Sequence, residues 1–446
     1  MDTTDDEDPE HFNRARPTVA LQTVGCKLNQ AESESLAYKL CDAGFGVVAP
    51  DQDPDVYVLN TCTVTHIADR KCRHHLRSFR RANPHALVLA TGCYVDRDAA
   101  GVQVEGVDLT VGNTDKDRLV EIVTGRLENR VRRPLAVSGH GSRIPDTTFN
   151  GYEAQLFRTR SLVKVQDGCN QCCSFCIVPH VRGRERSVPT DEVVTEVNDR
   201  ASRGYQEVIL TGTRIGAYKE GLAGLVRRIL DDTAIPRLRL SSLQPGELPT
   251  SFIELWRDNG RICRHLHLAL QSGSDSVLRR MGRGHCTGEY EETVNLVREG
   301  MPDIAITTDV IVGFPGESEE EFEESYRFCE RIGFAGLHIF PFSARPGTPA
   351  ARMPGKVPEK IKKSRSRIML ELAGRSAQDF RRRFSGQTMP VLWEERKGEG
   401  LWIGHTGNYI KAITSSSLPW REGVRGRGII ETKLSGEYED ALWGDI

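Results

Sequence analysis

Short apolar runs alternate with helical patterns over the first third of the chain. The run VALQTV, for example, ends at Gly25 and precedes the helical segment AESESLAYKLCDAG. Strands that alternate with helices form a parallel sheet with helices on both faces. The runs that predict its strands lie at 19–24, 56–60, 87–92 and 107–112. We therefore predict an α/β domain over residues 17–137.

The same alternation resumes beyond residue 155, after a connector rich in Gly, Ser and Pro that we place at 138–154. Six strand–helix units are too many for a small open sheet and favour a partial β/α barrel. We place this central domain at 155–384, with a basic helix as its last element. Its predicted strands lie at 161–166, 207–212, 237–242, 265–270, 305–313 and 336–342.

A third pattern begins at residue 385, where short apolar and polar stretches alternate between glycines. This pattern is typical of a small all-β barrel, which we predict over 385–446. Residues 1–16 are polar and acidic, and we expect them to form a disordered tail. No apolar run approaches the length of a membrane span, about 20 residues. We therefore expect a cytoplasmic protein without a membrane partner.

The chain has 12 cysteines, which in a cytoplasmic protein indicate metal binding or catalysis before disulfides. Cys26, Cys62 and Cys93 each follow the end of a predicted strand. The carboxyl ends of parallel strands share one edge of a sheet, so the three thiols can converge. Three thiolates fit an iron–sulfur cluster with one open iron better than a closed zinc site. The alternative is that the three are ordinary buried thiols.

Four further cysteines lie in the stretch DGCNQCCSFC, directly after the first strand of the central domain. Two adjoining CxxC pairs would suggest zinc, but zinc ribbons separate their pairs by about 15–20 residues. The better interpretation omits Cys172 and takes Cys169, Cys173 and Cys176 as a second three-thiolate cluster site. Its loop would lie at the barrel mouth, where such folds place their active sites. Cys172 is expected to be a spectator that could replace a ligand.

Strand ends around the same mouth offer candidate cofactor contacts, because glycine lets the backbone approach a nucleotide closely. Ordinary turns and caps are the alternative explanation of these positions. We also expect His265 and His267, on one strand, to point to opposite faces and form no ligand pair. The candidate cofactor-binding residues are Thr211, Gly212, Gln271, Ser272 and Gly313.

The CxxxCxxC spacing after a strand resembles the radical S-adenosylmethionine family. The motifs TVGCKLNQAES, NTCTVT, GCY, LALQSGSDSVLRRM and TDVIVGFPGESEEEF resemble, more narrowly, its methylthiotransferases, over nearly the whole chain from Thr18. GCKLN, NTCTVT and SSLQPGEL are similar to the threonylcarbamoyladenosine branch. The resemblance implies S-adenosylmethionine and two [4Fe–4S] clusters, an auxiliary one on the first three cysteines and a radical-generating one on the second three. It also implies that the C-terminal barrel is an RNA-binding TRAM domain.

The implied reaction converts N6-threonylcarbamoyladenosine beside the tRNA anticodon into its 2-methylthio derivative. A radical from the cofactor attacks the C–H bond, so no side chain is expected to act as a catalytic acid or base. Arg182 or Arg184 would meet the methionine carboxylate or RNA phosphates. The implied partners are the tRNA anticodon stem-loop, a sulfur donor, and an electron donor such as flavodoxin or ferredoxin.

Two alternatives keep the radical chemistry and act on isopentenyladenosine in tRNA or on an aspartate of a ribosomal protein. A third, from another class, is a non-catalytic zinc protein that binds RNA, which would leave Cys26, Cys62 and Cys93 without a role.

A local run of positive charge offers candidate RNA contacts, although the net charge of the chain is only −2. The segment 360–383 holds nine Lys and Arg residues against two acids. A solvated helix face is the alternative interpretation. The candidate RNA-binding residues are Lys360, Lys362, Lys363, Arg381, Arg382 and Arg383.

Overall fold

A computed structural model describes residues 16–103, 105–130, 159–398, 400–419 and 427–446. The expected connector, 138–154, and residues 1–15 of the expected acidic tail lie outside the described residues. In the described part of the chain no helix is long and apolar enough to cross a membrane.

The N-terminal unit is a five-stranded parallel sheet in the order β2-β1-β3-β4-β5, as the alternating pattern predicts. Strands β3 and β4 are buried at every residue, because helices cover both faces of the sheet. The strands are β1 (Thr18–Thr23), β2 (Gly46–Val47), β3 (Val56–Thr61), β4 (Leu87–Gly92) and β5 (Leu109–Val111). The helices are α1 (Lys27–Asp42), α2 (His66–Ala82), α3 (Cys93–Arg97), α4 (Ala99–Gln103), η1 (Lys116–Arg118) and α5 (Leu119–Arg130).

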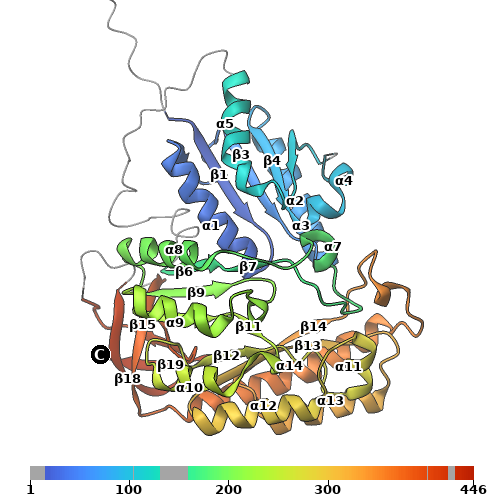
Figure 1. The fold of residues 1–446 in the computed structure, drawn as a ribbon, viewed down its shortest axis with the longest axis vertical. Helices are drawn as coiled ribbons and strands as arrows, with labels where there is room; N and C mark the ends of the chain where they lie inside the picture. The colour runs from blue at the N-terminus through green and yellow to red at the C-terminus, as the bar shows by residue number, and fades with distance from the viewer. Residues whose placement is uncertain (1–15, 104, 131–158, 399, 420–426) are drawn as a thin grey trace, which may run out of the picture.

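The central unit is an open barrel of six strand–helix units between Arg160 and Arg382 (Figure 1). Its parallel strands form two sheets, ordered β10-β9-β6 and β11-β12-β13-β14. The principal strands are β6 (Arg160–Lys164), β9 (Glu207–Thr211), β10 (Arg237–Leu240), β12 (His265–Leu268), β13 (Ala305–Val312) and β14 (Gly336–Pro341). Short strands are β7 (Gln166–Asp167), β8 (Arg186–Ser187) and β11 (Ser242–Leu243).

Helices cover the outer face of this barrel and leave its inner face polar. Along β13, Ile306, Thr308 and Val310 are buried, whereas the alternating Thr307 and Asp309 are only partly buried. The helices are α7 (Val178–Arg182), α8 (Thr190–Ser202), α9 (Leu222–Asp232), α10 (Thr250–Asp258), α11 (Asp275–Met281), α12 (Thr287–Gly300), α13 (Glu319–Ile332) and α14 (Glu359–Arg382). Single 3₁₀ turns are η2 (Ile215–Ala217), η3 (Pro245–Glu247) and η4 (Pro349–Arg352).

Helix α1 belongs to the first sheet by sequence but also covers β6, the edge strand of the barrel. Its Glu34 accepts hydrogen bonds from the Leu162 backbone N–H (3.2 Å) and the Ser161 hydroxyl (2.6 Å). Ala31 packs against Leu162 and Ile209. Because a covered edge has its backbone donors paired, α1 both caps the barrel and joins the two units (Figure 1).

The C-terminal unit is a closed barrel in the order β15-β16-β17-β19-β18, as predicted, and Trp393 is fully buried within it. It packs on the amino-terminal ends of the central strands. Arg239 of β10 is completely buried there, pairs with Glu207 of β9 at 2.6 Å, and lies 3.7 Å from the Tyr409 ring. The strands are β15 (Thr388–Lys397), β16 (Leu401–Thr406), β17 (Lys411–Thr414), β18 (Gly428–Tyr438) and β19 (Ala441–Asp445).

We expect Arg239→Met to destabilise the protein strongly, because it removes the nearest partner of the buried Glu207 carboxylate and leaves, among the described residues, only Arg237 at 3.9 Å as an ion-pair partner. The cost of breaking such a pair is about 3–5 kcal/mol. The measurement is the denaturation midpoint followed by tryptophan fluorescence. The matched control, Arg228→Met on the exposed face of α9, should cost at most about 1 kcal/mol. Adding Glu207→Leu to Arg239→Met should restore most of the lost stability. Equal denaturation midpoints for Arg239→Met and Arg228→Met would contradict the expectation.

Candidate active site

Three of the predicted metal-binding cysteines meet at the carboxyl edge of the first sheet. Cys26 caps α1, Cys62 follows β3, and Cys93 begins α3 directly after β4. Burial, with the nearby thiols of Cys26 and Cys93, raises the pKa of Cys62 to about 12. Gly25 has a φ of 123°, and a Cβ there would lie 2.9 Å from the Cys62 sulfur. This position therefore requires glycine so that the chain can pass the thiol.

The second set meets on the loop between β7 and α7. The Gln171 backbone N–H lies 3.4 Å from the Cys169 sulfur, and Arg283 Nη1 lies 3.5 Å from the Cys173 sulfur. Burial, with the nearby thiols of Cys173 and Cys169, raises the pKa of Cys176 to about 11. The loop is thus arranged around three thiols.

Cys172 lies apart from this set. Its side chain is exposed, and its sulfur lies 4.0 Å from the carbonyl oxygen of Asn170 on its own loop. The neighbouring thiols that act on Cys176 are those of Cys173 and Cys169. The structure therefore groups the cysteines in the CxxxCxxC spacing and leaves Cys172 facing solvent.

Arg182 lies buried between the two thiol sites and binds groups from both. Its guanidinium donates to Glu32 Oε1 at 2.9 Å, to Asp167 Oδ1 at 3.0 Å and to Asn29 Oδ1 at 2.6 Å. Burial acts to raise the pKa of Glu32, but Lys116 and Arg182 hold it well below its usual range. Because these partners satisfy the Arg182 guanidinium, the expectation that it binds a substrate carboxylate or phosphate is wrong.

None of the partners of Arg182 is among the residues predicted from the sequence. Glu32 lies within a helix that has only a weak apolar stripe, and Lys116, which pairs with Glu32, lies in a 3₁₀ turn. Asp167 had one signal, its position directly before the GCNQCC stretch.

Most of the candidate cofactor residues have local packing roles. Ser272 is turned toward α13, where its hydroxyl lies 2.9 Å from that of Ser325. A Cβ on Gly212 would lie 2.7 Å from the Gln166 carbonyl oxygen, and one on Gly313 would overlap the Lys362 stem. Thr211 is buried at the end of β9. Gln271, three residues beyond the end of β12, has a φ of 78°, a strained backbone for a non-glycine residue.

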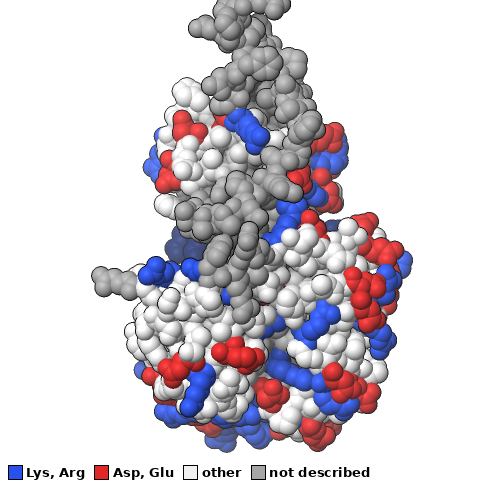
Figure 2. All heavy atoms as spheres, turned by 90° about the vertical axis from the view of Figure 1, so that its left-hand side faces the viewer, with Lys and Arg blue, Asp and Glu red and all other residues white. Residues whose placement is uncertain are grey.

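The six candidate RNA-binding residues are not equally available on α14. Lys362 is turned to the protein, where it pairs with Glu359 and donates to the Phe342 carbonyl oxygen at 3.3 Å. Arg382 pairs with Glu437, and Arg383 donates to the Pro302 carbonyl oxygen. Arg381 is partly buried, while Lys360 and Lys363 are exposed. On the face shown in Figure 2, basic and acidic side chains are mixed over the lower part of the molecule.

The expectation that His265 and His267 point to opposite faces is wrong. Residues two apart on a strand share a face. Accordingly, His265 Nε2 and His267 Nδ1 lie 2.9 Å and 3.0 Å from the same Thr307 hydroxyl on the inner face of the barrel.

Both thiol sets fit iron–sulfur clusters by the chemistry of their donors. Each offers three thiols, which would leave one iron of a four-iron cluster without a protein ligand. A structural zinc site would be closed by a fourth protein ligand, and Cys172 does not supply one.

Comparison with known proteins places both sites within described families. Residues 163–329 match the radical SAM superfamily, and residues 18–112 match the uncharacterized protein family UPF0004. The threonylcarbamoyladenosine tRNA methylthiotransferase MtaB of Aquifex aeolicus is 39% identical over 84% of this chain and 92% of its own length. The tRNA-2-methylthio-N(6)-dimethylallyladenosine synthase of Saccharophagus degradans is 34% identical over 96% of this chain and 98% of its own.

A solved structure shows a similar fold. The radical S-adenosylmethionine methyltransferase TsrM from Kitasatospora setae, with cobalamin and a [4Fe-4S] cluster bound, has a TM-score of 0.56 and 16% identity. The likeness covers 87% of this chain and 81% of that one. At this identity the comparison supports the arrangement of the domains and not a shared reaction.

We expect Cys172→Ala to keep both clusters and Cys173→Ala to lose one. After anaerobic reconstitution the wild type should hold about eight irons per chain and the Cys173 variant about four. Iron and sulfide content, with the absorbance of the brown protein, provide the measurement. A loss of iron in the Cys172 variant, or none in the Cys173 variant, would show that the loop uses a different set of thiols.

Proposed function

Since the chain belongs to the radical S-adenosylmethionine methylthiotransferase family, we propose that it modifies tRNA at N6-threonylcarbamoyladenosine. The product would carry a methylthio group at carbon 2 of the adenine. The observation that carries this proposal is the pair of three-thiol sites on either side of the buried Arg182. Identities of 33–39% to several threonylcarbamoyladenosine enzymes support this substrate. The dimethylallyladenosine synthases, up to 34% identical, make that nucleoside the second candidate.

The enzyme uses S-adenosylmethionine and [4Fe–4S] clusters, and the two thiol sets would hold the clusters. Cys169, Cys173 and Cys176 would hold the one that opens on the barrel mouth. When bound there, the cluster would supply the electron for cleavage of the cofactor, whereas the auxiliary cluster would present the sulfur that a separate donor provides. Arg283 would stabilise the Cys173 thiolate as a charged hydrogen-bond donor.

The remaining protein groups position the reactants. Arg182 would hold the two thiol sites at a fixed separation, because it binds Glu32 of α1 on one side and Asp167 on the other. Gln271 and Thr211 remain candidates to contact the cofactor at the strand ends. A general acid or base is not required by hydrogen-atom transfer.

The chemistry also requires partners. An electron donor such as flavodoxin or ferredoxin would reduce the radical cluster, and a separate donor would supply sulfur. A tRNA substrate would place the activity in the cytoplasm. The C-terminal barrel, with the exposed basic side chains of α14, would contact the RNA outside the reacting loop.

We expect the two cysteine sites to separate the two halves of the reaction. Cys173→Ala should abolish formation of 5′-deoxyadenosine, because the radical site loses its cluster. Cys62→Ala should keep that cleavage but stop transfer of the methylthio group. Mass spectrometry of nucleosides from an anticodon stem-loop, with chromatography of the cofactor products, measures both. If the wild-type enzyme leaves threonylcarbamoyladenosine unchanged, the proposed substrate is wrong.

We expect the double variant Lys360→Ala with Lys363→Ala to bind tRNA more weakly and with a smaller salt dependence. Each lost phosphate contact should lower the slope of log affinity against log salt by about 0.7–0.9. Equilibrium binding at several salt concentrations provides the measurement, with the exposed Lys219→Ala as control. Unchanged slopes would remove α14 from the RNA surface. Deletion of the whole C-terminal barrel would be less informative, because it uncovers Arg239 and Arg160.

A further inference from the structure

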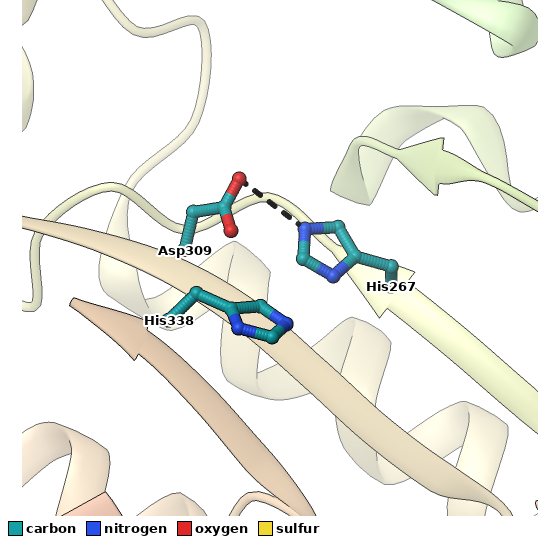
Figure 3. A group of neighbouring side chains, drawn as sticks. All are labelled: His267, Asp309 and His338. Carbon is teal, nitrogen blue, oxygen red and sulfur yellow. Dashed lines mark ion pairs between the residues drawn. The ribbon is translucent and has the colours of Figure 1, made fainter. Parts of the chain in front are cut away.

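Three side chains on the inner face of the central barrel form a polar group that the proposed chemistry does not use. His267 of β12, Asp309 of β13 and His338 of β14 come from three neighbouring strands and point toward one another (Figure 3). One ligand atom from each lies within 4.8 Å of the others, and His267 Nε2 lies 3.4 Å from Asp309 Oδ2. The burial falls from His267 to the exposed His338, so the group opens to solvent.

The hydrogen bonds behind His267 fix where its proton lies. His265 Nδ1 is buried with no hydrogen-bond partner among the described residues, so its ring proton is better placed on Nε2, which faces Thr307. The Thr307 hydroxyl then accepts from His265 and donates to His267 Nδ1. His267 is left with its proton on Nε2, directed at Asp309.

This tautomer favours a hydrogen-bonding subsite over a metal site. A metal requires a free lone pair on Nε2, whereas here that nitrogen carries the proton that orients the Asp309 carboxylate. Asp309 is partly buried and His338 is exposed, so both can be reached by a ligand. Burial lowers the pKa of both His265 and His338, and the positive charge of Lys27 lowers both further. Lys27 therefore brings positive charge to the group.

Side chains that start beside each of the two three-thiol sites reach the surroundings of this group. On one side, Lys27 directly follows Cys26, and its ammonium reaches the inner face, 5.9 Å from the Tyr409 ring. On the other side, Arg283 contacts both the Ala269 carbonyl oxygen and the Cys173 sulfur. Ala269 is two residues beyond His267, which is about 7 Å along a strand. A substrate base placed between the clusters would therefore bring its substituent to this group.

We propose that Lys27, His338 and the His267–Asp309 pair bind the threonylcarbamoyl substituent of the substrate adenosine. This inference rests on the proposed function and names the residues that would select the substituent on the substrate adenosine. Lys27 and His338 would donate to the carboxylate, and Asp309 would accept from the threonyl hydroxyl or the carbamoyl N–H. A dimethylallyl substituent has no polar atom for these groups, so burying it here would leave them unpaired.

Substrate competition and direct binding test this subsite. The variants are Lys27→Met and His338→Leu, and the matched control is His74→Leu on the exposed surface of α2. The holoenzymes are given two anticodon stem-loops, one with threonylcarbamoyladenosine and one with dimethylallyladenosine. We expect both variants to raise KM for the first loop at least tenfold and to bind free threonylcarbamoyladenosine correspondingly more weakly. Iron content and 5′-deoxyadenosine formation without RNA should match the control.

Three outcomes would overturn the subsite. Equal losses with both loops would show that the group supports the fold or the radical step. Unchanged KM and nucleoside binding would show that the substituent lies elsewhere. A further equivalent of zinc or iron, lost in Asp309→Asn, would make the group a metal site. If the wild type itself fails to convert threonylcarbamoyladenosine, the proposed function fails, and this result is distinct from all three.

Discussion

The arrangement of the active site depends on one buried guanidinium. Arg182 is 2% exposed and is shared by Glu32, Asn29 and Asp167, which belong to two different structural units. Removing the guanidinium would take one partner from each of two buried carboxylates and would leave Glu32 to Lys116 and Asp167 to Arg186. The helix that carries it, α7, also packs Ile177 and Val181 against Cys93. The ion pairs and this apolar contact act on the same short helix and fix the distance between the thiol sites.

Helix α1 extends the same constraint along the whole interface. Its N-terminus carries Cys26, its middle supplies Glu32 to Arg182, and Glu34 satisfies the edge of β6. The hydroxyls of Tyr38 and Tyr205, 2.7 Å apart, continue the contact beyond it. One helix therefore positions the auxiliary site, supports the buried ion pairs and completes the wall of the barrel. Its residues are mostly buried on several sides, which explains why its sequence has only a weak apolar stripe.

The sequence predicted the elements of this fold well because each unit has its own local period. The strands 56–60 and 87–92 are found within one residue of their predicted limits, since apolar runs between polar turns permit few other registers. The grouping of Cys169, Cys173 and Cys176 follows from spacing on a single loop. Side chains two residues apart on a strand share a face, so the sequence alone was sufficient to place His265 and His267 together. The prediction that they point to opposite faces applied this rule incorrectly.

Contacts between units could not be predicted in the same way. The basic pattern of α14 does not distinguish Lys363, which is exposed, from Arg365, which is buried against Glu317. The role of Arg182 required the positions of α1 and the cysteine loop together.

The contact between the C-terminal barrel and the amino-terminal end of the central barrel has a consequence for turnover. The Tyr409 ring packs against Arg239 and His265 at the amino-terminal end of the strands, which would direct molecules to the inner face from the carboxyl end, where the thiol sites lie. An RNA loop seated there would obstruct the smaller nucleoside cofactor, and binding and release would therefore follow a compulsory order.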